Sequence, residues 1–153
     1  MSTNSRMSVA VHVLAWIAYD RRGTDKEIAT SERIATSVNT NPVVIRRALG
    51  QLRAAGLVDG SRGRSAGWQL TRDASQITLL DVYRAVGEGE LFALPAAPPD
   101  AECYVGYGIH NVLANTYRDA QRALRAELEK VTVADVLRDA LALSEARIAD
   151  SSP

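Results

Sequence analysis

Residues 58–72, VDGSRGRSAGWQLTR, decide the fold, because three glycines and three arginines lie there between two apolar segments. Leu57 and Val58 begin the first segment, and in the second Trp68 and Leu70 alternate with polar residues. Alternation of apolar and polar side chains is typical of a strand with one buried face. The stretch therefore predicts a two-stranded hairpin whose connection is rich in glycine and positive charge.

The tip of this hairpin has the composition of a loop that approaches a polyanion. Gly60, Gly63 and Gly67 allow tight or left-handed backbone conformations. Arg62 and Arg64 are then expected to be exposed at the end of the hairpin. Exposed arginines of this kind contact phosphates or enter the narrow minor groove of DNA. The alternative interpretation is a flexible loop whose charge is incidental.

Three short helices are predicted before the hairpin. Residues 7–19 repeat apolar side chains at helical spacing, and a second helix follows Thr30 or Ser31. Asn41 followed by Pro42 predicts the start of a third helix. Asparagine caps the first free amides of a helix, and proline at the first helical position loses no needed donor.

The third helix, which we expect to end at Gly56, has one apolar face and one basic face. At 100° per residue, the inward face carries Ile45, Ala48, Leu49 and Leu52. The outward face carries Val43, Arg46, Arg47, Gly50 and Arg53. A basic third helix followed by a hairpin is the arrangement of a winged helix-turn-helix, whose third helix enters the DNA major groove. The alternative is an ordinary solvated helix face.

The rest of the chain predicts further helices separated by a loop. A short helix starts at Thr78 with Asp81 completing a capping box, and residues 87–104 form a loop or linker rich in Gly and Pro. Residues 105–130 lack proline and carry an apolar stripe over six turns, at Ile109, Val112, Leu113, Tyr117, Ala120, Leu124 and Leu128. A last helix begins at Thr132, and its apolar residues are expected to brace the long helix.

The stripe of the long helix points to a second copy of the chain. A small domain cannot easily cover a helix of this length, so burial against the same helix of another subunit is the economical explanation. Packing on its own domain is the alternative. The predicted domains are a winged helix-turn-helix over residues 1–86, a linker over residues 87–104 and dimerisation helices over residues 105–153.

Charge and composition restrict the classes of function. Residues 1–72 hold 11 basic and 5 acidic side chains and the remainder holds 7 and 13, so the zero net charge combines +6 with −6. A basic half favours a polyanion partner. The apolar run over residues 9–19 is too short to span a bilayer, and a single cysteine fits a reducing cytoplasm. The chain has no nucleophile elbow, phosphate loop or paired-carboxylate motif, so we do not expect an enzyme.

The third helix, the hairpin and the capping box together resemble the Rrf2 family of bacterial winged-helix transcription regulators. The matching elements are Gly56-Leu57-Val58, Arg62-Gly63, Ala66-Gly67-Trp68, Leu70 and Ile77. A weaker similarity extends over residues 103–137. The resemblance implies a homodimer that binds palindromic promoter DNA, and we expect it to act as a repressor.

The family resemblance also implies roles for individual residues. Arg46, beside Val43 and Arg47, falls where the family reads base edges, and Arg62 with Gly63 falls where the wing enters the minor groove. Arginine suits both positions because its planar fork donates two parallel hydrogen bonds. Phosphate contacts are expected from the flanking residues Arg53 and Arg64. A protein-binding winged helix or a ligand-binding regulator is the alternative.

The signal that such a regulator would sense is left open by the residues. Cluster-binding members of the family carry three cysteines before the long helix, whereas this chain has only Cys103, so an iron–sulfur cluster and a metal site are not expected. Cys103 is a candidate redox sensor or a small residue without that role, and with His110 it would supply half of a metal site. Aromatic residues around the same loop line a small-molecule pocket or pack on one another: Phe92, Tyr104, Tyr107 and Tyr117.

Overall fold

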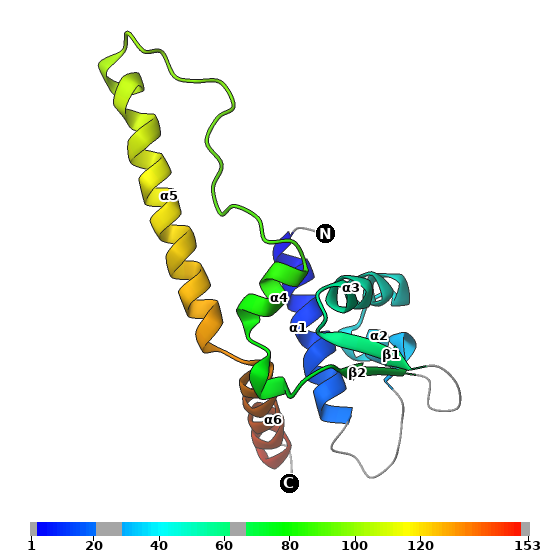
Figure 1. Cartoon of the computed structure of the whole chain (residues 1–153). Coiled ribbons are helices and arrows are strands. Elements are labelled where there is room, and N and C mark those ends of the chain that lie inside the picture. The colour runs from blue at the N-terminus through cyan, green and yellow to red at the C-terminus, as the bar shows by residue number, and fades with distance from the viewer. Residues whose placement is uncertain (1–2, 21–28, 62–66, 151–153) are drawn as a thin grey trace. The chain divides into compact units, whose positions relative to one another are not determined.

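The computed structural model describes residues 3–20, 29–61 and 67–150, and these residues are mainly helical with one small hairpin (Figure 1). The elements in chain order are α1 (Thr3–Asp20), α2 (Ser31–Val38), α3 (Pro42–Ala54), β1 (Val58–Ser61), β2 (Gly67–Leu70), the 3-10 turn η1 (Ala74–Gln76), α4 (Leu79–Ala85), α5 (Tyr104–Lys130) and α6 (Val133–Asp150). The predicted fold class is confirmed.

The chain forms two units by its internal contacts. Residues 1–88 and 129–153 make up the first, here called the core unit, and residues 89–128 make up the second, the α5 unit. The sequence analysis grouped the last helix with the long helix, whereas α6 belongs to the core unit.

The centre of the core unit is α1, with α4 on one side and α2, α3 and the hairpin on the other (Figure 1). Its buried side chains repeat at helical spacing and include Ala10, Val13, Leu14 and Ile17. The inward face of α3 consists of the four predicted residues Ile45, Ala48, Leu49 and Leu52, all of which are buried. The predicted orientation of α3 is therefore confirmed.

Local signals in the sequence fix the ends of α2 and α3. The Thr30 side chain accepts a hydrogen bond from the Arg33 amide at 3.3 Å, and the Asn41 side chain accepts one from the Val43 amide at 2.8 Å. Gly56 follows α3 with a φ of 71°, in the left-handed region that glycine adopts at low cost. The chain therefore turns at Gly56 and enters β1 (Val58–Ser61) directly after the helix.

The hairpin pairs β1 and β2 in antiparallel register. Val58 faces Leu70 and Ser61 faces Gly67, so the buried ends of both strands meet against the core. The Trp68 amide donates a hydrogen bond at 3.0 Å to the carbonyl of Ala29, which ties β2 to the segment before α2. The root of the predicted wing is thus fixed on the helix-turn-helix.

The beginnings of α4 and α6 are built alike and lie side by side. In each, a threonine and the aspartate three residues later exchange hydrogen bonds: Thr78 with Asp81, and Thr132 with Asp135. The predicted capping box at Thr78 is therefore confirmed, and Thr132 and Asp135 form a second one. Thr78 and Thr132 also form an antiparallel bridge, which joins segments that are far apart in the chain.

Helix α6 packs on α1, a contact that the sequence does not predict. Val133 and Leu137 are buried in the core with α1, and Leu141 packs against the same cluster. Ile148, which was expected to pack on the long helix, is 67% exposed. The capping box and the bridge to Thr78 direct α6 back onto α1, and helical spacing alone cannot reveal that direction.

The α5 unit consists of a segment without regular structure and the long helix, whose predicted extent is confirmed. The Gln121 side chain holds this segment by accepting a hydrogen bond from the Leu91 amide at 3.1 Å and donating one to the Gly89 carbonyl at 3.3 Å. Phe92 lies on Tyr117 with 5.0 Å between ring centroids. No residue of α5 is buried.

Candidate nucleic-acid interface

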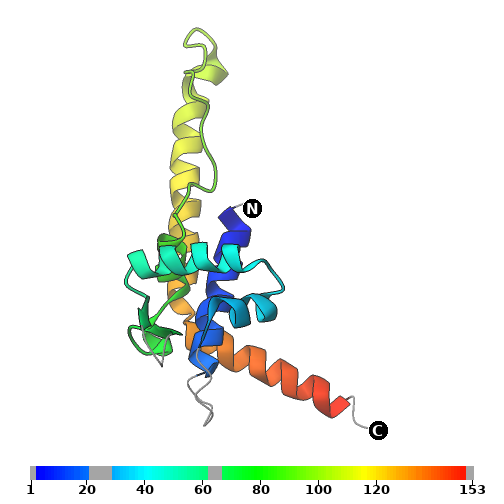
Figure 2. The same ribbon diagram turned by 90° about the vertical axis from the view of Figure 1, so that its right-hand side faces the viewer.

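The outward face of α3, which the sequence predicts to be basic, is exposed. Asn41 and Pro42 start the helix so that Val43, 62% exposed, stands in its first turn. The remaining residues of this face are also exposed: Arg46, Arg47, Gly50 and Arg53. Figure 2 shows α3 crossing α1 at the surface of the core unit. The structure therefore brings these five predicted residues together on one accessible helix face.

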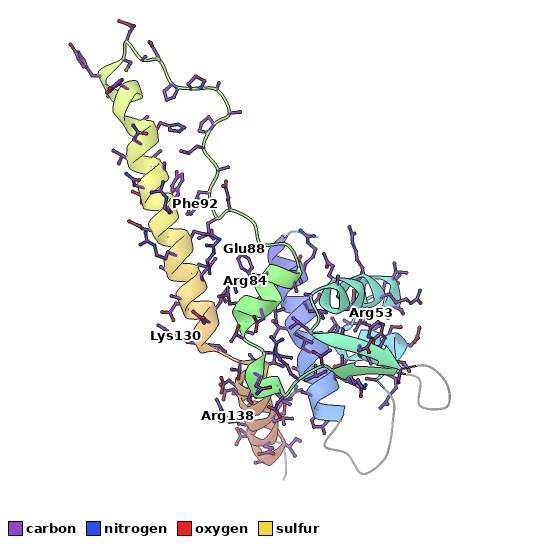
Figure 3. All side chains as sticks on the ribbon, viewed as in Figure 1. Arg53, Arg84, Glu88, Phe92, Lys130 and Arg138 are labelled. Atoms are coloured by element: carbon purple, nitrogen blue, oxygen red, sulfur yellow. The ribbon has the colours of Figure 1, made fainter. Side chains whose placement is uncertain are left out.

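Two of the arginines on this face form ion pairs that the sequence analysis missed. Arg46 lies 3.5 Å from Glu32 at the start of α2, and Arg53 lies 3.7 Å from Asp59 on β1. All four side chains are largely exposed, as Figure 3 shows for Arg53, so the pairs contribute little stability. They do reduce the positive potential at the surface that a polyanion would approach.

Glu32 is held in its charged form at this surface. Hydrogen bonding to its own backbone amide is the largest cause that lowers the pKa of Glu32, and the Ser31 hydroxyl and the Arg46 guanidinium add to it. A carboxylate that stays ionised remains a partner for Arg46 and a competitor for any phosphate. Arg47, by contrast, forms no ion pair with any residue that the structure describes.

The tip of the hairpin carries three further predicted contacts. Arg62, Gly63 and Arg64 lie outside the described residues. At the root, the Ser61 hydroxyl donates a hydrogen bond to the Gly67 carbonyl at 3.3 Å, and the Asp59 carboxylate accepts one from the Gly60 amide at 2.9 Å. Ser61 and Gly67, the described residues on either side of the tip, are therefore held together beside α3.

Contacts between α1 and α2 position the helix-turn-helix. His12 and Ser37 hydrogen bond at 3.0 Å between their side chains, and the Arg33 guanidinium lies over the Trp16 ring at 5.1 Å from its centroid. Burial lowers the pKa of His12, which favours its neutral form. Arg33, one of the basic residues of the N-terminal half, thus stacks on Trp16 of α1.

Cys103 is exposed and directly precedes α5. Hydrogen bonds from the backbone amides of Gly106 and Val105 lower the pKa of its thiol, which is the effect expected at a helix start. Gly106 is needed there, since a side chain would collide with the carbonyl oxygen of Asp100. His110 lies two turns along the helix, and within the described ranges no three His, Cys, Asp or Glu residues gather to hold a metal ion.

The predicted aromatic cluster is brought together only in part. Phe92 packs on Tyr117, whereas Tyr104 and Tyr107 are 98% and 76% exposed. The structure thus favours packing between aromatic rings for the first pair and assigns no contact to the second.

Comparisons with known proteins agree with this geometry. The model of the Rrf2 family, described as an iron-dependent transcriptional regulator, matches residues 3–139. YwnA of Bacillus subtilis, named as an HTH-type transcriptional regulator, is 42% identical over 135 residues, which cover 88% of this chain and 96% of YwnA.

Solved structures show the same fold. A crystal structure named as that of a DNA-binding protein is 39% identical, with a TM-score of 0.66 over 86% of this chain and 98% of the other. CymR, the global cysteine regulator of B. subtilis, has a TM-score of 0.66 over 90% of this chain and 95% of its own, and at 17% identity it supports the fold alone. None of the helices in the described ranges is long and apolar enough to cross a membrane.

Proposed function

Since the chain belongs to the Rrf2 family of DNA-binding transcriptional regulators, we propose that it represses transcription as a homodimer on a palindromic operator. Its family and its relatives are regulators of transcription, and the chain is not an enzyme. The observation that carries the proposal is the exposed basic face of α3 beside the root of the hairpin. A helix with this placement reads the major groove in winged helix-turn-helix proteins.

The residues of α3 divide into two roles in this proposal. Arg46, with Arg47 beside it, reads base edges in the major groove, where an arginine donates two parallel hydrogen bonds to guanine. Exposed Val43 contacts apolar groups such as the thymine methyl. Arg53, at the far end of the helix and next to β1, contacts phosphate. To bind DNA, Arg46 must break its ion pair with Glu32 and contact a base instead.

The hairpin supplies the second contact. Arg62 with Gly63 enters the minor groove, and Arg64 contacts a phosphate beside it; these assignments rest on the sequence and the family resemblance. The position of the hairpin root next to α3 supports them, because a loop that starts there reaches the groove adjacent to the one that α3 occupies.

The homodimer is supported by the surface of α5. The helix carries an apolar stripe, yet its Val112 is 64% exposed and none of its residues is buried within the chain. Burial of such a stripe against the same helix of a second copy removes it from water and creates a two-fold axis. Two reading helices related by that axis match a palindromic operator.

The residues present do not fit the iron–sulfur cluster of cluster-binding family members. The only cysteine is Cys103, whereas such a cluster needs several thiolates or comparable ligands. We therefore propose that DNA binding by this chain requires no cluster. Oxidation of Cys103 stays a prediction, and it is tested by measuring DNA binding with and without oxidant in wild type and Cys103→Ser.

The experiment that tests the proposed function measures binding of the purified protein to DNA upstream of its own gene. We expect Arg46→Ala to weaken operator binding by about 10- to 100-fold, the effect of losing one bidentate base contact. Arg84→Ala on α4, outside this face, is the control (Figure 3). Unchanged operator binding by Arg46→Ala would contradict the proposal, and competition by an acidic protein in place of DNA would favour an interaction module.

A further inference from the structure

A groove of about 400 Å³ lies between α1 and α3, and among its described lining residues only Arg47 belongs to the contacts proposed above. It is lined by Arg6, Val9, Val44, Arg47, Ala48 and Gln51. Two of these residues come from α1 and four from α3, so the groove exists only because the two helices cross (Figure 2).

The spacing of the lining residues explains the shape of the groove. Arg6 and Val9 are three residues apart on α1, and the four residues of α3 follow helical spacing over two turns. Each set therefore forms one strip along its helix, and the two strips face each other. Small and apolar side chains, Val9, Val44 and Ala48, form part of the lining between the polar ends of Arg6, Arg47 and Gln51.

The polar groups of the groove are all suited to an anion. Among the residues that the structure describes, two guanidinium groups and one amide line it, and no acidic side chain does. A second groove, of about 310 Å³, provides the contrast: it includes Glu32, and its Arg53 pairs with Asp59. The described lining of the first groove thus combines two arginines with no carboxylate, whereas that of the second includes Glu32.

We propose that the groove between α1 and α3 receives a backbone phosphate of the DNA, with Arg6 and Arg47 as donors. This inference rests on the proposed function and extends it, because it adds α1 to the DNA-binding surface. When a helix lies in the major groove, the phosphate backbones run along its two sides. Arg47 belongs both to the exposed face of α3 and to the groove, so a backbone beside α3 passes the groove.

The test compares Arg6→Gln with Arg84→Gln, an exposed arginine of α4 in the same unit. Binding of a double-stranded operator fragment, and of an unrelated duplex of equal length, is followed by fluorescence anisotropy from 0.1 M to 1 M salt. One lost phosphate contact reduces the slope of log K against log salt by about 0.9, which is about eightfold in affinity at 0.1 M salt relative to 1 M. We expect this for Arg6→Gln on both duplexes, and no change for Arg84→Gln.

A second measurement identifies the phosphate itself. Single uncharged methylphosphonate linkages are placed along the operator, and one position is expected to weaken the wild type clearly more than it weakens Arg6→Gln, which retains only the Arg47 contact. Thermal unfolding checks that the variant is folded, and Arg6→Met, which keeps the apolar stem, gives the same test if it is not. Arg6→Lys is expected to restore most of the salt slope.

The outcomes separate this inference from the proposed function. If the wild type binds the operator and folded Arg6→Gln keeps its salt slope on both duplexes, the inference is wrong and the proposed function stands. If the wild type binds neither duplex, the proposed function fails first. Inorganic phosphate is the third probe: saturable binding that Arg6→Gln abolishes, without a change in DNA binding, would assign the groove to a small anion and overturn the inference.

Discussion

The two units of this chain differ in what their apolar residues contact. Every buried apolar residue lies in the core unit, where α1 is surrounded by the other helices and the hairpin, whereas the α5 unit has no buried residue at all. Burial of apolar surface is the main driving force of folding. The core unit therefore has its own source of stability, and in the proposed homodimer the stripe of α5 is buried against a second copy of the chain.

The same difference separates the two proposed activities. The DNA-binding face lies on α3, whose other side is fixed in the core, so its arginines are presented by a rigid element. The proposed dimer contact lies on α5. Mutations that act on folding, on association and on DNA binding are thus expected to map to different places.

The largest effect is expected in the core. Leu49→Ala removes a side chain that is fully buried, and it should destabilise the protein by about 3 kcal/mol through lost burial and the cavity that it leaves. Urea unfolding followed by circular dichroism measures this. Gly50→Ala is the control on the exposed face, and it should stabilise α3 by about 0.5–1 kcal/mol. Equal effects of both changes would mean that α3 is not packed as described.

A charge in the stripe of α5 is expected to have the next largest effect, on association. Leu124→Glu should weaken self-association by about 2 kcal/mol or more, because it removes apolar burial and desolvates a carboxylate. Sedimentation equilibrium provides the measurement. Ala126→Glu adds the same charge to an exposed position on the opposite face of the helix and should leave association unchanged. Should Leu124→Glu remain as associated as the wild type, the stripe is not the dimer contact.

A smaller effect is expected from the capping box of α4. Burial pushes the pKa of Asp81 upward, but hydrogen bonds from Thr78 and the charge of Arg72 outweigh it and the pKa lies below its usual value. A depressed pKa contributes stability above the unfolded value of 3.8, and this is lost as pH falls below it. Asp81→Asn should cost about 1 kcal/mol at pH 7.

Unfolding of Asp81→Asn and the wild type, measured from pH 7 to pH 2, checks this prediction. The difference between the two proteins should shrink as the wild-type carboxylate becomes protonated. Because Asp81 belongs to the core unit, association at pH 7 should not change. A gap that stays constant down to pH 2 would show that the charge of Asp81 has no part in stability.

The smallest effect is expected at the DNA-binding face. Glu32→Gln frees Arg46 from its ion pair and removes a negative charge, so operator binding should strengthen by about two- to fivefold, in line with the small energy of exposed pairs. The anisotropy assay measures it, with Glu145→Gln on α6 as the control for total charge. Weaker binding of Glu32→Gln would mean that Glu32 positions Arg46 for DNA.

Much of the core unit could be predicted from the sequence because its signals are local. The cap at Asn41, the glycine at position 56 and the alternation after Gly67 each act within a few residues, and the structure confirms the helix start, the helix end and the strand. The split of α3 into apolar and basic faces followed from helical geometry alone.

The contacts that the sequence could not supply all depend on how elements cross. The pair between Glu32 and Arg46 joins two helices across a turn, and the groove beside Arg6 exists only where α1 meets α3. The packing of α6 on α1 needs a bridge between Thr78 and Thr132. Periodicity within one segment shows which face is buried, but it does not show which other segment covers that face.

The bridge between Thr78 and Thr132 has a consequence for how this architecture can change. On either side of it, the Leu79 amide donates to the Val131 carbonyl at 2.8 Å, and the Val133 amide donates to the Ile77 carbonyl at 2.9 Å. These bonds close a loop that contains α4 and residues 89–128, and the entropy of closing such a loop changes slowly with its length. Insertions and deletions within residues 89–128 need not disturb the core unit, so the proposed dimer contact can evolve separately from the proposed DNA-binding face.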